Sequence, residues 1–222
     1  MSSVPFSASP RRACHRTLPR VLSRPLFSIL LAATASAQCT MEWVPSASVP
    51  GVDHWVRAIT AWDPDGAGPA SEVVVIGGRF TSGGPVAAQM VVSFDFATGT
   101  WSAMGDGFSD GGYPEMEAFA TLPNGDLVAG GDFTRSGSTV VNGIARWDGT
   151  AWQPLGSGMN GPVFSLAVTP ARDLIAGGAF TLAGGVAANN IARWDGTAWH
   201  PLGAGVNSSV TALAVLPNGD VA

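Results

Sequence analysis

The amino-acid sequence predicts an all-β protein folded as a β-propeller, with blades that are four-stranded antiparallel sheets. Three observations lead to this prediction. A long segment repeats at a constant offset, glycine is abundant while charged residues are scarce, and tryptophans recur in pairs at the same place in each repeat. We expect about three complete blades and further partial ones.

The repeat is the strongest of these signals. Residues 173–203 match an earlier part of the chain, and Gly177, Trp194 and Trp199 each have an identical counterpart 47 residues upstream. A fixed period of this length is typical of repeat architectures, in which each unit buries its apolar faces against its neighbours.

The composition favours strands and tight turns over helices. Asp, Glu, Lys and Arg make up only 12% of the 222 residues, about half the usual share, and there are 29 glycines. Glycine is a poor helix former, and few long charged side chains remain to cover a helix surface. We therefore expect no helix of ten residues after the N-terminal segment.

Each repeat divides into four strands. In the copy that starts at Val163 we expect strands at 163–168, 173–176, 191–195 and 198–202. The last two are separated by Asp195-Gly196, a pair that favours the tight turn of a β-hairpin. The unit is therefore an antiparallel meander.

The paired tryptophans indicate that each meander is one blade of a propeller. Each indole has about 150 to 250 Å² to bury, which at about 25 cal/mol per Å² is an upper bound of roughly 4 to 6 kcal/mol. A single sheet cannot cover both of its faces, so neighbouring sheets must sandwich it. Small residues at fixed positions of every first strand indicate that these strands crowd around an axis.

The chain after residue 37 divides into units in order. We expect residues 41–45 to complete the final blade. Because the sequence ends inside the second strand of its last unit, we expect a fragment that aggregates when produced alone, through unpaired edges and an uncovered blade face. The predicted blades are 55–104, 116–156, 163–203 and the incomplete 210–222.

The N-terminus has the pattern of a secretory signal peptide. Residues 1–25 are basic, residues 26–33 are apolar, and small residues lead to a cleavage site after Ala37. The apolar run is shorter than the roughly 20 residues that span a bilayer. We therefore expect a secreted or cell-surface protein, extracellular or periplasmic, with no membrane span after signal removal. Cys39 then either pairs with a cysteine beyond the sequence or stays a free thiol.

The charge of the mature chain argues against nucleic acid as a partner. After residue 37 there are six arginines, no lysine and sixteen acidic residues, a net charge of −10. Such a chain lacks the basic surface that binds phosphate backbones or anionic membranes.

Several motifs resemble the kelch repeat. The segment FDFATGTW at 94–101, with the Gly77-Gly78 doublet upstream, has the kelch order of a glycine doublet, an aromatic and a tryptophan. Two longer sequence patterns, found in the copies that start at Gly130 and at Gly177, are similar to those of kelch-like propellers of exported bacterial proteins and of the fungal cortical-marker type. These patterns are G-G-x-F-T and I-A-R-W-D-G-T-x-W-x-P-L-G. The resemblance covers nearly all of residues 39–222 and implies a propeller, but it is nearly silent on chemistry.

The resemblance to galactose oxidase, a copper enzyme on a kelch propeller, does not extend to its ligands. The mature chain has one tyrosine, Tyr113, and the histidines His54 and His200, and none falls on a ligand motif. We predict no catalytic residue, metal or cofactor here, and an exported non-catalytic propeller that acts as a binding or cell-surface interaction module. A propeller enzyme with catalytic residues beyond the sequence, or a structural spacer, remain the alternatives.

One loop is the candidate site for a protein or carbohydrate ligand. Loops between second and third strands, and from fourth strands to the next blade, share one rim of a propeller, and most of these are small and neutral. The exception is residues 106–117. Its polar residues are Asp106, Asp110, Tyr113, Glu115 and Glu117.

Two other patterns are interpreted as structural. Asp63 and Asp65 begin like a calcium loop, but the next ligand position is Ala67, so we expect an ordinary turn. Arg146 and Asp148 lie two apart on one strand, which favours a structural ion pair or packing between blades.

Overall fold

The computed structural model describes residues 8–12, 41–45, 51–66, 68–110 and 114–222. The chain forms two compact units, residues 1–50 and 51–222. In the first unit, β1 (Ala8–Arg12) pairs antiparallel with β2 (Met41–Pro45). The strand expected at 41–45 is present with those bounds, and its role in closing a final blade stays a prediction. The predicted cleavage site and Cys39 lie outside the described residues.

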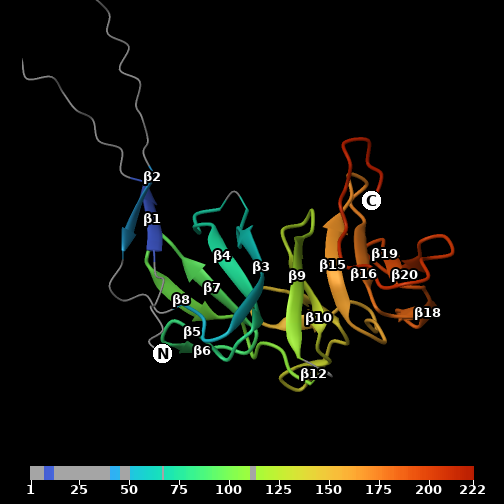
Figure 1. The fold of residues 1–222 in the computed structure, drawn as a ribbon, viewed down its shortest axis with the longest axis horizontal. Coiled ribbons are helices and arrows are strands. Elements are labelled where there is room, and N and C mark those ends of the chain that lie inside the picture. The colour runs from blue at the N-terminus through green and yellow to red at the C-terminus, as the bar shows by residue number, and fades with distance from the viewer. Residues whose placement is uncertain (1–7, 13–40, 46–50, 67, 111–113) are drawn as a thin grey trace, which may run out of the picture. The chain divides into compact units, whose positions relative to one another are not determined.

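The second unit contains three four-stranded antiparallel sheets, which follow one another along the chain (Figure 1). Each sheet keeps its strands in sequence order, as a meander does. Blade 1 consists of β3 (Trp55–Trp62), β4 (Val73–Arg79), β7 (Val91–Asp95) and β8 (Thr100–Ala103). Blade 2 consists of β9 (Glu115–Thr121), β10 (Leu127–Asp132), β13 (Ile144–Trp147) and β14 (Trp152–Pro154). Blade 3 consists of β15 (Val163–Val168), β16 (Leu174–Gly178), β19 (Ile191–Trp194) and β20 (Trp199–Pro201).

This arrangement confirms the predicted all-β fold of propeller blades. The first strands β3, β9 and β15 lie side by side, so each blade packs its inner edge against the next. No helix occurs among the described residues.

Each blade also carries a small hairpin between its second and third strands, where the sequence was interpreted as a plain loop. A glycine in the left-handed conformation makes each tight turn, at Gly84, Gly137 and Gly184. The hairpins are β5 (Ser82–Gly83) with β6 (Val86–Ala87), β11 (Arg135–Ser136) with β12 (Thr139–Val140), and β17 (Leu182–Ala183) with β18 (Val186–Ala187).

The last unit, which was predicted as an incomplete blade, is shorter than the three blades. Residues 210–222 fold back as a hairpin with one isolated bridge, between Val215 and Val221. The backbone N–H of Val210 donates to the carbonyl of Gly178, which attaches this hairpin to blade 3.

The glycine doublets explain how closely the inner strands approach. The first glycine of each doublet faces the inner strand of the following unit, where a Cβ atom would collide with apolar side chains. Gly77 faces Met116 and Phe119, Gly130 faces Val163 and Leu166, and Gly177 faces Val210 and Leu213. The second glycine lies against the inner strand of its own blade at a register shift, where a Cβ would meet a carbonyl oxygen at 2.1 to 2.2 Å.

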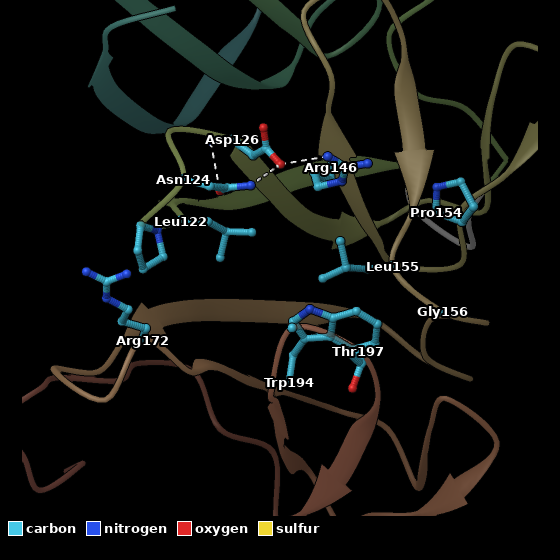
Figure 2. A pocket seen from close by; sticks show the side chains of 12 residues that line it. Leu122, Asn124, Asp126, Arg146, Pro154, Leu155, Gly156, Arg172, Trp194 and Thr197 are labelled. Atoms are coloured by element: carbon cyan, nitrogen blue, oxygen red, sulfur yellow. Dashed lines mark hydrogen bonds and ion pairs between the residues drawn. The ribbon is translucent and has the colours of Figure 1, made fainter. Parts of the chain in front are cut away.

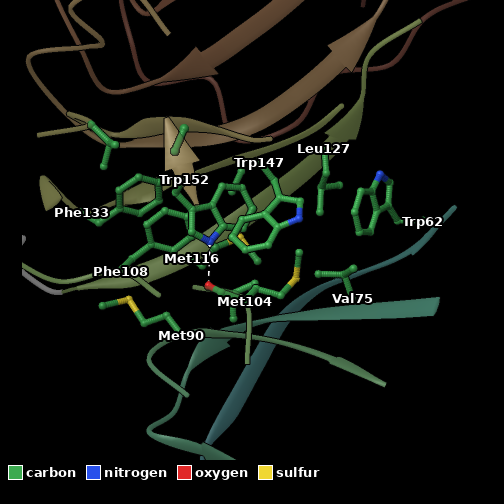
Figure 3. Packing of buried hydrophobic residues seen from close by; sticks show 14 residues of the cluster. Trp62, Val75, Met90, Met104, Phe108, Met116, Leu127, Phe133, Trp147 and Trp152 are labelled. Atoms are coloured by element: carbon green, nitrogen blue, oxygen red, sulfur yellow. Dashed lines mark hydrogen bonds between the residues drawn. The ribbon is translucent and has the colours of Figure 1, made fainter. Parts of the chain in front are cut away.

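The paired tryptophans fasten each blade to the one before. The ring centroids of Trp147 and Trp152 lie 5.2 Å apart, and Trp152 is almost fully buried among side chains of blades 1 and 2 (Figure 3). The Nε1–H of Trp152 donates to the Met104 carbonyl at 3.0 Å, and Trp199 donates to the Leu155 carbonyl at 2.9 Å. Burial of the indoles between sheets, as the sequence predicted, therefore comes with a repeated hydrogen bond across the junction.

Candidate binding sites

The structure separates the polar residues predicted on the 106–117 loop into two groups. Asp106 and Asp110 lie beside the hairpin of blade 2, whereas Glu115 and Glu117 belong to strand β9. Tyr113 lies outside the described residues. The loop therefore does not present all of these side chains at one place.

Glu115 forms an ion pair with Arg57 that joins two blades. Its two carboxylate oxygens accept hydrogen bonds from Nε and an NH2 group of Arg57 on β3, at 2.5 and 3.2 Å. Burial, and then the charge of Glu115, raise the pKa of Glu117. The ion pair of Arg57 and Glu115 joins the inner strands of blades 1 and 2, and sequence reasoning missed Arg57 because its partner lies 58 residues away.

One residue before each first strand donates its backbone N–H to the hairpin of the same blade. This residue is Asp53 in blade 1, Ser109 in blade 2 and Asn160 in blade 3. In blade 1, Asp53 accepts hydrogen bonds from the backbone N–H groups of Thr81 and Ser82, at 2.8 and 3.1 Å. In blade 3, Asn160 accepts the corresponding two bonds from Thr181 and Leu182, both at 2.8 Å. Each of these side chains therefore ties its loop to the hairpin of its own blade.

In blade 2 the backbone has taken over that task. The carbonyl of Ser109 accepts the N–H groups of Thr134 and Arg135, and Asp110 takes a left-handed conformation with φ of 56°. The carboxylate of Asp110 is 64% exposed, with one oxygen 3.5 Å from Nε of Arg135. Asp110 follows the anchoring residue Ser109, and this ion pair is the side-chain contact that it makes with other described residues.

A cavity of about 590 Å³ lies beside this carboxylate, and we call it the Asp110 cavity. Segments of blade 2 and the approach to blade 3 enclose it. Its side chains are mainly polar, and they include Asp110, Asp132, Thr134, Asn142 and Asn160. Asp110, which belongs to the predicted rim loop, therefore lies at the edge of a cavity.

A second cavity, of about 680 Å³, lies between blades 2 and 3 and shares no residue with the first (Figure 2). We call it the Arg172 cavity. Its walls include the turn between β9 and β10, the segment after β14, the turn between β15 and β16 that carries Arg172, and the turn between β19 and β20. The side chains that line it include Leu122, Asn124, Leu155, Arg172, Trp194 and Thr197.

One wall of this second cavity is fixed by an ion pair. NH1 of Arg146 lies 2.6 Å from an oxygen of Asp126, which also accepts the Nδ2–H of Asn124 at 2.7 Å. Blade 3 repeats the ion pair with Arg193 and Asp173, at 3.0 Å. The sequence correctly favoured a structural role for Arg146, but its partner is an acid on the neighbouring strand turn and not Asp148.

A cavity of about 660 Å³ lies at the junction of blades 1 and 2, in the place that the Arg172 cavity has between blades 2 and 3. Its lining differs from that of the Arg172 cavity in charge. We call it the acidic cavity. It contains the Asp63 and Asp65 turn, in which Asp65 accepts the Ala70 N–H at 2.9 Å. Among the described residues, no three His, Cys, Asp or Glu side chains converge as metal ligands would. Its acids are Asp63, Asp65, Glu72, Asp126 and Asp148.

Comparison with known proteins identifies the type of propeller. The family model for the Rax2 C-terminal beta propeller domain matches residues 66–220, which is more than half of the chain. No curated protein gives a significant match. The described part of the chain contains no helix long and apolar enough to cross a membrane.

Proposed function

The chain belongs to the Rax2 C-terminal beta propeller family, and on that premise we propose that it is an exported, non-catalytic propeller that acts as a binding module at the cell surface. Kelch-like propellers, which its motifs resemble, include such interaction modules. A signal peptide ending at Ala37 fits a surface role, since it would deliver the blades outside the cell.

The observation that carries this proposal is the exposed carboxylate of Asp110 beside a polar cavity. The equivalent residue of blade 3 is Gly161, which has no side chain to offer a ligand. An exposed charged side chain at the edge of a cavity of ligand size is the expected form of a recognition residue.

The cavity favours a ligand that donates hydrogen bonds. Asp110 is an acceptor, and Asn142 and Asn160 already donate their side-chain N–H groups to Ser157 and Thr181. Hydroxyl groups of a carbohydrate or N–H groups of a protein loop satisfy such a surface. We therefore propose one of these two classes as the ligand of this rim.

Binding of fluorescently labelled protein to intact cell walls tests this function. Asp110→Asn should reduce the bound fraction several-fold, because a charged acceptor is worth about 1.5 to 3 kcal/mol. Glu72→Gln, which removes the same charge from the acidic cavity, should bind as the wild type does. Equal retention of the Asp110 variant and the wild type would remove the cavity from the proposal.

Export is tested separately by N-terminal sequencing of protein recovered from the culture medium. The proposal expects the mature chain to begin at Gln38. Full-length protein that stays inside the cell would contradict it.

A further inference from the structure

Arg172 is strained in a way that its counterparts are not. The turn between the first two strands of a blade needs a residue with positive φ, and this residue is Gly125 in blade 2 and Gly219 in the last unit, both with φ of 89°. Blade 3 places Arg172 there, with φ of 73°. A non-glycine residue held in this region costs stability, and such residues concentrate at functional sites.

No contact of the Arg172 guanidinium with the described part of the chain accounts for the strain. Within the described residues this guanidinium makes no hydrogen bond or ion pair, whereas Arg146 and Arg193 are both paired with aspartates. Its side chain extends along the cavity wall toward the turn that carries Leu122 and Asn124 (Figure 2). An unneutralised charge therefore borders a cavity of about 680 Å³.

The rest of the cavity offers an aromatic surface beside polar groups. Trp194 is half-buried, with the edge of its indole against Gly156, and its ring lines the cavity together with Leu155. Asn124 and Thr197 add polar side chains. The volume of this cavity lies within the range of about 300 to 1,000 Å³ that is typical of small-ligand sites.

The charge distinguishes this cavity from its equivalent one junction earlier. The acidic cavity has Gly125 where this one has Arg172, and five acids line it. The Arg172 cavity instead has two arginines and a single acid, Asp126, which Arg146 already neutralises. Of these two hollows, the one between blades 2 and 3 is suited to an anion.

We propose that the Arg172 cavity binds a carboxylate-bearing sugar, a uronic acid unit of a saccharide. Arg172 accepts the carboxylate in a two-pronged contact, for which a guanidinium is well shaped, and Trp194 packs against the sugar ring. One free guanidinium matches the single charge of a carboxylate better than the double charge of a phosphate monoester. This site is separate from the Asp110 cavity, so the inference goes beyond the proposed function.

Titration of the full chain with an oligomer of glucuronic acid, followed by calorimetry and tryptophan fluorescence, tests the inference. We expect saturable binding and a change in indole emission. A neutral glucose oligomer of equal length should bind about tenfold or more weakly, which is the worth of a charge-assisted contact. Glucose 6-phosphate tests the phosphate alternative and should also bind more weakly.

Two substitutions at equivalent positions provide matched variants. Arg172→Gly restores the residue of the other copies and should weaken glucuronate binding about tenfold or more while circular dichroism stays unchanged. Gly125→Arg places the same side chain in the acidic cavity and should create no second site. Asp110→Asn should leave glucuronate binding unchanged, so this result does not depend on the proposed function.

Three outcomes would overturn the inference. The first is no measurable binding of the glucuronate oligomer, and the second is equal affinity of the wild type and Arg172→Gly. Tighter binding of glucose 6-phosphate than of glucuronate would overturn the carboxylate assignment.

Discussion

Arg172 adopts a backbone conformation that the two equivalent turns leave to glycine, and this has a consequence for stability apart from any ligand. Arg172→Gly should raise the free energy of unfolding by about 1 kcal/mol, because left-handed conformation costs an L-residue roughly that much. Urea denaturation measures the difference. Arg172→Ala, which keeps the strain and loses the guanidinium, should stay near the wild type. A less stable glycine variant would mean that the side chain contributes to the fold.

Asp53 links stability to pH through its loop contacts. Hydrogen bonds from the hydroxyl and then the backbone N–H of Thr81 lower its pKa to about 2. Since the folded pKa lies below the ordinary value near 4, the ionised group stabilises the fold above that pH, and this contribution is lost as the pH falls toward 2.

Asp53→Asn should separate the contact from the charge. The amide oxygen of Asn160 makes the same backbone contacts in blade 3, so the variant should keep the stability of the wild type at neutral pH. It should lose less stability than the wild type between about pH 5 and about pH 2.5, because one carboxylate no longer takes up a proton. Urea unfolding at several pH values measures this, with Glu72→Gln expected to follow the wild type.

At the scale of the strand, the two glycines of each doublet have different tasks, and substitution should distinguish them. A Cβ on Gly130 would meet side-chain atoms of Val163, the nearest at 2.7 Å, whereas a Cβ on Gly131 would meet the backbone oxygen of Glu115 at 2.2 Å. Gly130→Ala should cost about 1 to 3 kcal/mol, which is typical of overpacking. Gly131→Ala should cost more, because a backbone within a sheet cannot give way as a side chain can.

Thermal unfolding of the two variants measures this order. Gly99→Ala serves as a reference, because a Cβ at that exposed turn meets no atom within 4 Å and only its positive φ opposes the change. Equal losses at Gly130 and Gly131 would contradict the division of tasks.

Strands and blades followed from the sequence, because a repeat fixes many residues at once. The bounds of β15 and β19 lie within one residue of those expected from period and turn residues. The small hairpins were missed because their strands of two residues have no detectable alternation. In the incomplete unit expected at 210–222, the structure forms one isolated bridge, between Val215 and Val221.

The site was less predictable than the fold. Asp110 was named from the polarity of its loop, but its place beside a cavity depends on how that loop lies against the hairpin of blade 2. Arg172 was missed, although comparison of the turns LPNGD and TPARD shows an arginine in a glycine position. Comparison of the two turns cannot show the cavity, because it forms where two blades meet.

At the scale of the whole second unit, each blade is completed by its neighbour. Val163 and Leu166 of β15 pack on a glycine of blade 2, and the indole of Trp199 donates to a carbonyl of that blade. The same register places Val56 and Ile59 at the outer face of β3, where they are 42% and 64% exposed. Among the described residues, Trp101 is the one whose indole N–H is buried without an acceptor.

This uncovered face should make the protein self-associate. Trp55 is also 59% exposed on β3, so large apolar side chains lie together on one strand of blade 1. Apolar patches of this kind favour association or aggregation. Ile59→Asp should therefore shift the sedimentation profile toward monomer at a concentration where the wild type forms larger species.

The matched control is Leu182→Asp, which changes an exposed leucine of the blade 3 hairpin in the same way. Because that leucine lies away from β3 in the sheet order, its substitution should leave the wild-type profile unchanged. A wild-type protein that stays monomeric, or equal effects of the two substitutions, would show that the β3 face is not where the molecules meet. The contacts that cover the equivalent faces of blades 2 and 3 would then not be needed to keep the protein soluble.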